Sequence, residues 1–317
     1  MDSLFLHYNI ENELSQANFI KTKNNLQTKK QEQNKVISIL INALRETKHH
    51  TDEKEKRLID CGTFITISPT SGRITSANFC KNKLCPICQW RKSLKVYGEI
   101  LQIQKRVEET TKDFIFFTLT LENTKDLEKG INEILKGFYN FSNDRTFKKI
   151  SKGYIRTLEI TYNEKRETWH PHIHLIVALK ENYFIQNYKE QKEWAKIWER
   201  CAKKEYTPII DVRKVKQDKD EETYKKAIAE ISKYSVKPFA TKKDKSQEYA
   251  YKSIIKETHH RRLRSYGGIY AKIKKELNFN DGEEPESIAK ETDKVFRFQK
   301  NKYIEIEHIK GEWIEKS

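Results

Sequence analysis

Long apolar segments are missing from this chain of 317 residues. No run approaches the roughly 18 apolar residues that a membrane-spanning helix needs. The N-terminus, which begins Met1-Asp2-Ser3-Leu4, also lacks the layout of a secretory signal peptide. We therefore expect a soluble, cytoplasmic protein with no membrane partner.

Cysteine, glycine and proline are scarce, with 5, 10 and 6 residues respectively. Five unevenly placed cysteines are too few for the disulfide framework of a secreted protein of this length. Acidic residues are outnumbered by basic ones, 46 to 62, which gives a formal net charge of +16. This excess favours a polyanionic partner such as nucleic acid, although a well-solvated lysine-rich surface would have the same composition.

Four of the cysteines follow a metal-binding pattern. Cys80, Cys85 and Cys88 are spaced C-x4-C-x2-C, and Cys61 precedes them. A Cys-x-x-Cys turn lets two thiolates reach one ion, and two further cysteines complete the tetrahedral set that structural Zn²⁺ prefers. Reduced thiols beside a core, or a redox pair, are the alternatives. We predict a structural zinc site.

Two histidines lie two residues apart in an apolar stretch, Pro171-His172-Ile173-His174. Side chains alternate along a strand, so both imidazoles face the same side of the predicted sheet. Two neutral imidazoles with a third ligand can hold a divalent metal and leave a coordination position for substrate. His170, just before Pro171, could be structural or functional.

A hairpin centred between Lys165 and Arg166 supplies the third ligand. With that turn, residue 159 lies opposite 172 and residue 157 lies opposite 174, so Glu159 becomes the cross-strand neighbour of His172. One carboxylate and two imidazoles suit Mg²⁺ or Mn²⁺. The alternative for Glu159 is an ordinary solvated strand carboxylate.

Hydrophobic periodicity predicts an α+β fold with the order β-α-β-β-α-β. We expect an antiparallel sheet with helices packed on one face and the polar histidine face open. The predicted elements are strand 114–121, helix 127–138, strands 154–162 and 172–179, a Trp-rich helix near 194–201, strand 208–212 and a helix over 221–234.

Composition suggests four segments. They are a basic, partly disordered N-terminal arm (1–55) with one helix near 36–44, a small zinc-binding module with four cysteines (56–105), a catalytic domain (106–245) and a C-terminal helical extension (246–317).

Glu230 and Tyr234 are four residues apart on the last predicted helix, which puts them on one face and within mutual reach. A phenol can attack a phosphodiester whose charge is offset by a metal, giving a covalent phosphotyrosine. A neighbouring carboxylate could handle the proton. With 15 tyrosines in the chain, such a pair also arises by accident as a surface contact.

Together these motifs resemble the plasmid rolling-circle replication initiators (Rep proteins) of the His-hydrophobic-His (HUH) endonuclease superfamily. The resemblance covers residues 58–278 and rests on five blocks in the family's order: 79–91 with the cysteines, 116–120 (Phe-Phe-Thr-Leu-Thr), 169–174 (Trp-His-Pro-His-Ile-His), Glu230-x-x-x-Tyr234 and 261–268 (Arg-Arg-Leu-Arg-Ser-Tyr-Gly-Gly).

The resemblance implies a ferredoxin/RRM-like catalytic core and metal-dependent nicking and joining of DNA at an origin. Tyr234 would be the nucleophile, His172 and His174 would hold the metal, and Glu230 would activate water for the terminating cleavage, as in the branch with a single tyrosine. The partners would be the origin duplex, its extruded single strand, and a host helicase and polymerase.

Two other classes of protein fit parts of the pattern. His170-x-His172-x-His174 matches the histidine-triad nucleotide hydrolases and transferases, in which a histidine attacks without a metal. A non-enzymatic DNA-binding regulator built on the zinc module would make the histidines structural. The histidine-triad hypothesis leaves Tyr234, the cysteines and the net charge without a role.

Overall fold

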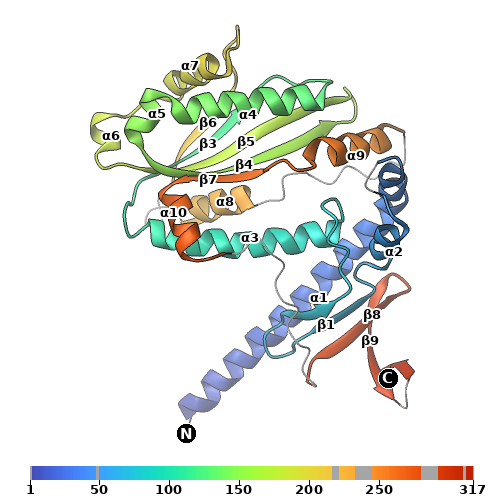
Figure 1. Ribbon diagram of the computed structural model, residues 1–317. Coiled ribbons are helices and arrows are strands. Elements are labelled where there is room, and N and C mark those ends of the chain that lie inside the picture. Colours follow the sequence, from blue (N-terminus) through green and yellow to red (C-terminus); the bar gives the residue numbers. More distant parts are fainter. Residues whose placement is uncertain are drawn as a thin grey trace. The chain divides into compact units, whose positions relative to one another are not determined.

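The computed structural model describes residues 2–47, 50–215, 221–232, 245–279, 292–309 and 312–316. It divides into two compact units, one formed by Met1–Arg91 with Asp281–Ser317 and the other by Lys92–Asn280. Each unit contains helices and its own five-stranded antiparallel sheet (Figure 1). Over the described ranges, no helix has the length and apolar character needed to cross a membrane.

The first unit is built from an N-terminal and a C-terminal segment of the chain. Its sheet has the order β10-β9-β8-β1-β2. Its elements are α1 (Asp2–Arg45), α2 (Asp52–Asp60), β1 (Phe64–Ile67), β2 (Ile74–Ala77), the start of α3 (Pro86–Val107), β8 (Lys294–Gln299), β9 (Lys302–Ile309) and β10 (Glu312–Glu315).

The N-terminal segment differs from the expected partly disordered arm, because it forms one helix, α1, that packs into the first unit. Leu26, Gln33 and Leu40 are spaced by seven residues and are fully buried. The side-chain amide of Gln33 donates to the Leu58 carbonyl at 2.7 Å. The many Lys, Asn and Gln residues made the segment look basic and solvated in sequence, although the eight Lys and Arg residues of positions 1–55 are balanced by eight Asp and Glu.

The second unit contains the predicted β-α-β-β-α-β series, and that order is confirmed. Its sheet has the order β6-β3-β5-β4-β7. Its strands are β3 (Phe114–Thr120), β4 (Ser151–Asn163), β5 (Thr168–Leu179), β6 (Ile210–Val215) and β7 (Arg264–Gly268). Its helices are the rest of α3, α4 (Leu127–Asn143), α5 (Arg145–Ile150), α6 (Tyr183–Gln186), α7 (Gln191–Ala202), α8 (Glu221–Ser232), α9 (Lys245–Thr258) and α10 (Ile269–Glu276).

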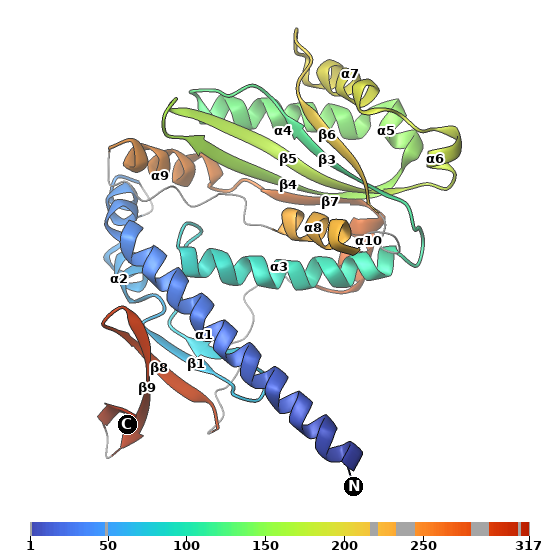
Figure 2. The same cartoon turned by 180° about the vertical axis from the view of Figure 1, so that it is seen from behind.

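Helices cover both faces of this sheet, so the expectation of helices on one face was wrong (Figure 2). On one face, Phe117 of β3 packs against Phe141 of α4 and Trp194 of α7. On the other, Phe116 and Ile176 share a buried cluster with residues of α3, α8 and α10. The histidine face is apolar at one end and polar at the other, and burial of the apolar end draws helices onto a face that looked open in the sequence.

The tail expected to be a helical extension is also different. It contains α9 and α10, but β7 adds an edge strand beside β4, and β8 pairs with β1 with Phe64 opposite Arg297. The hydroxyl of Tyr303 in β9 donates to the Gly62 carbonyl at 2.6 Å. The tail therefore completes both sheets. The sequence of β7, Arg-Ser-Tyr-Gly-Gly, carries little of the apolar alternation that predicts a strand, whereas β9 alternates over Ile304-Glu305-Ile306-Glu307 and is a strand signal that sequence reasoning missed.

Candidate functional site

The β4–β5 hairpin has the register that the sequence predicts. Glu159 pairs with His172, and Thr157 pairs with His174. On the other side of β5, Thr118 of β3 lies opposite His174. Because paired residues in a ladder share a face, these side chains lie together on the same side of the sheet.

Glu159, His172 and His174 form a compact, buried group. The distance from Glu159 Oε2 to Nε2 is 3.1 Å for His174 and 3.7 Å for His172. The three residues are 1%, 8% and 6% exposed, in that order. One potential ligand atom from each lies within 4.8 Å of the others. The three predicted metal ligands are therefore brought together.

Hydrogen bonds orient both imidazoles. Nδ1 of His172 lies 3.0 Å from the His170 carbonyl oxygen, which can only accept, so Nδ1 carries a proton and the lone pair of the neutral ring is on Nε2. Nδ1 of His174 lies 3.3 Å from Thr118 Oγ1. An outer hydrogen bond of this kind fixes the ring and tautomer of a metal-binding histidine. His170 contributes its carbonyl to this arrangement, and its ring stacks on that of His172 with a centroid distance of 5.0 Å.

Helix α8 brings a second carboxylate to the same place. Glu230 Oε1 is 3.6 Å from Nε2 of His174, and the Glu230 side chain is 30% exposed. The predicted nucleophile, Tyr234, lies outside the described residues, two positions after the last residue of α8, Ser232. One buried carboxylate and two oriented imidazoles are donors that fit Mg²⁺ or Mn²⁺, and a second, partly exposed carboxylate lies beside them.

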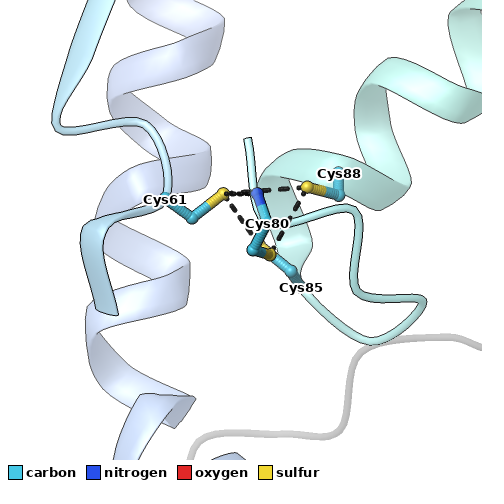
Figure 3. Close-up of side chains that lie close together, drawn as sticks. All are labelled: Cys61, Cys80, Cys85 and Cys88. Atoms are coloured by element: carbon cyan, nitrogen blue, oxygen red, sulfur yellow. Dashed lines mark hydrogen bonds between the residues drawn. The ribbon is translucent and has the colours of Figure 1, made fainter. Parts of the chain in front are cut away.

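The four cysteines of the first unit form a second cluster (Figure 3). Sulfur–sulfur distances are 3.6 Å for Cys61–Cys85, 3.7 Å for Cys61–Cys88 and 3.6 Å for Cys80–Cys88. Tetrahedral zinc with Zn–S bonds of about 2.3 Å would separate its sulfurs by about 3.8 Å. None of the four is in a disulfide. The geometry and the thiol donor set fit Zn²⁺.

The thiols cannot all ionise without a neighbouring cation. Hydrogen bonding, first of all from Cys61, lowers the pKa of Cys88, whereas the contact with Cys61 raises the pKa of both Cys80 and Cys85. The close approach of the sulfurs therefore opposes their joint ionisation. A bound divalent cation would offset that repulsion.

Lys30 of α1 is a neighbour of this cluster that sequence reasoning missed. Its ammonium donates to the Cys61 carbonyl at 2.7 Å and to Gln33 Oε1 at 2.8 Å, and the residue is 3% exposed. Burial lowers the pKa of Lys30, and the nearby thiols, led by Cys61, act in the opposite direction. Its position in the sequence could have indicated this burial, because Lys30 lies on the face of α1 that carries Leu26 and Gln33.

Comparison with known proteins identifies the family of this chain. The sequence model of a family described as replication protein matches residues 71–316. The chain belongs to the Rep family of plasmid replication proteins. It is 36% identical to a protein named Protein rep from Bacillus amyloliquefaciens, over 77% of this chain and 79% of the relative. It is 35% identical to a Protein rep from Streptococcus pneumoniae, over 72% and 73% of the two chains.

A Protein rep from a Bacillus species is 34% identical over 78% of this chain and 88% of its own length. No solved structure matches this Rep protein. Membership of this family supports a role in the initiation of plasmid replication, as the sequence predicts.

Proposed function

We propose that this Rep protein starts rolling-circle replication by cutting one DNA strand at the plasmid origin and remaining attached to it. The observation that carries the proposal is the group of Glu159, His172 and His174 beside Glu230, four residues before Tyr234. The net charge of +16 suits a DNA partner.

In the proposed reaction, the phenolic oxygen of Tyr234 attacks the scissile phosphorus. An O–P bond forms to the tyrosine, the bond from phosphorus to the 3′ oxygen breaks, and the leaving oxygen takes up a proton as a 3′ hydroxyl. The phenol proton passes to solvent. The host polymerase would extend the 3′ end, with a host helicase opening the duplex.

Glu159, His172 and His174 would hold Mg²⁺ or Mn²⁺, which would polarise the phosphate and offset charge that builds up on it. The fixed tautomer of His172 keeps a lone pair directed toward the site. Nε2 of both His172 and His174 lies within 4 Å of Glu159 Oε2, and this convergence favours a shared metal over attack by one histidine.

At the end of a replication round, the proposed role of Glu230 is to remove a proton from water, which then cleaves a regenerated origin. Its partial exposure, unlike the burial of Glu159, gives water access to it. The four cysteines would hold a structural Zn²⁺ in the first unit, with no part in the bond-making steps.

The test is a nicking reaction with supercoiled DNA carrying the flanking sequence of the replicon, in Mn²⁺ or Mg²⁺. We expect a metal-dependent nick and a covalent DNA adduct that maps to Tyr234 and is lost in Tyr234→Phe. Tyr139→Phe is the matched control, because Tyr139 is 68% exposed on α4. An adduct that survives Tyr234→Phe but disappears in His170→Ala, without need of metal, would support the nucleotide-hydrolase alternative. If no divalent ion supports a nick, the remaining hypothesis is the non-enzymatic DNA-binding regulator.

A further inference from the structure

We infer that Arg264 of β7, acting with Thr157 of β4, positions helix α8, which carries Glu230 and precedes the attacking tyrosine in sequence. The inference rests on the proposed function, since it concerns the helix that carries Glu230 and leads to Tyr234. Arg264 acts in this scheme as a positioning residue, through the helix and not on the reacting atoms.

Three hydrogen bonds carry the inference, and they converge on the carbonyl of Ile231. The hydroxyl of Thr157 donates to that oxygen at 2.8 Å, and Nη2 of Arg264 donates to it at 3.3 Å. Nε of Arg264 donates to Thr157 Oγ1 at 3.1 Å. The hydroxyl thus gives its proton to the helix and accepts one from the guanidinium, and the three groups close a ring.

The position of this ring in the sheet links it to the metal ligands. Thr157 pairs with His174 on one side and with Arg264 on the other, so the three residues form one row across β5, β4 and β7. Thr157 is 1% exposed. A shift of Arg264 is therefore transmitted to α8 through a buried hydroxyl directly beside His174.

Electrostatics explains why a cation lies here. A backbone carbonyl oxygen has two lone pairs and a partial negative charge, so it can accept from a hydroxyl and a guanidinium together. The side chains of Ile228 and Ile231 are anchored in the core. The guanidinium therefore holds α8 at the residue next to Glu230. A lysine has no rigid fork with which to reach both the carbonyl and the hydroxyl.

The test compares Arg264→Gln and Arg264→Lys with Arg262→Gln, which removes an exposed cation from the same segment. The rate of adduct formation is measured in a single turnover, at saturating origin DNA and Mn²⁺. We expect Arg264→Gln to slow it by about 100-fold, as misplacement of a reacting group by about 1 Å can do. Affinity for DNA and for Mn²⁺ should change little, Arg264→Lys should be intermediate, and Arg262→Gln should react at the wild-type rate.

Hydrogen exchange of the last turn of α8 gives a second readout that does not depend on activity. Arg264→Gln should speed exchange there and leave β3 protected. Should that variant fail to fold, Thr157→Val removes the other donor and should produce the same two effects. The inference is overturned by a folded variant that keeps both the wild-type adduct rate and the protection of α8, or by a loss confined to DNA affinity. A wild-type protein that forms no adduct would instead refute the proposed function, while exchange would still decide the positioning role.

Discussion

Glu159 of β4 lies directly opposite His172 of β5, with its Oε2 3.7 Å from the imidazole Nε2. Both residues sit in an antiparallel ladder whose backbone hydrogen bonds fix the strand spacing. The carboxylate and the imidazoles are therefore held close before any metal arrives. A preformed set of this kind loses little conformational entropy when it binds an ion.

Glu159→Gln should weaken Mn²⁺ binding, because it replaces a charged oxygen ligand by a neutral amide of the same shape. We expect a loss of at least about tenfold, since even outer-shell changes at metal sites cost about 10–100-fold. Isothermal titration of the metal-free protein with Mn²⁺ measures it. Glu167→Gln in the same hairpin is the control, because Glu167 is an exposed carboxylate outside the group. Equal affinities in the two variants would exclude Glu159 as a ligand.

Glu230→Ala should separate the two cleavages of the proposed cycle. The first nick requires Tyr234 and the metal ligands, whereas release of the product requires a base for water. We expect the variant to form the adduct and then accumulate protein-linked DNA, visible as a band of reduced mobility on a denaturing gel. Glu276→Ala, on the surface of α10, should turn over like the wild type. If Glu230→Ala releases the DNA product at the normal rate, another residue must activate the water.

Removal of zinc should expose four thiols and leave the fifth cysteine protected. Burial raises the pKa of Cys201 to about 11, and the residue is 6% exposed. Thiolate is the reactive form, and at pH 8 about 0.1% of a thiol with that pKa is ionised. We expect one Zn²⁺ per chain, with iodoacetamide labelling Cys61, Cys80, Cys85 and Cys88 only after chelation. Mass spectrometry of the labelled peptides reads this out, and rapid labelling before chelation would contradict a zinc site.

Lys30→Met should destabilise the first unit, because it leaves the buried carbonyl of Cys61 without its donor. An orphaned buried acceptor costs about 1–3 kcal/mol. Lys29→Met is the matched control: Lys29 pairs with Glu32 at a half-exposed position, and such a pair contributes about 0–1 kcal/mol. Urea unfolding followed by far-UV circular dichroism compares the two. A smaller loss for Lys30→Met than for Lys29→Met would show that the ammonium is not needed at the cluster.

The sequence by itself determined the features that depend on local spacing. Strand alternation put His172 and His174 on one face, and a short hairpin turn fixed Glu159 opposite His172. The C-x4-C-x2-C spacing predicted the cysteine cluster. Each of these follows from a backbone repeat or a turn that spans few residues, so no distant part of the chain was needed.

Only the tertiary structure decided the features that depend on distant partners. Helices α3, α8 and α10 cover the apolar end of the histidine face, the tail supplies strands to both sheets, and Lys30 reaches the cysteines from α1. Arg264 meets Thr157 and the Ile231 carbonyl although Thr157 and Arg264 are 107 positions apart in sequence. Such contacts are selected by burial and by the need to satisfy polar groups when the whole chain packs, and no local periodicity encodes them.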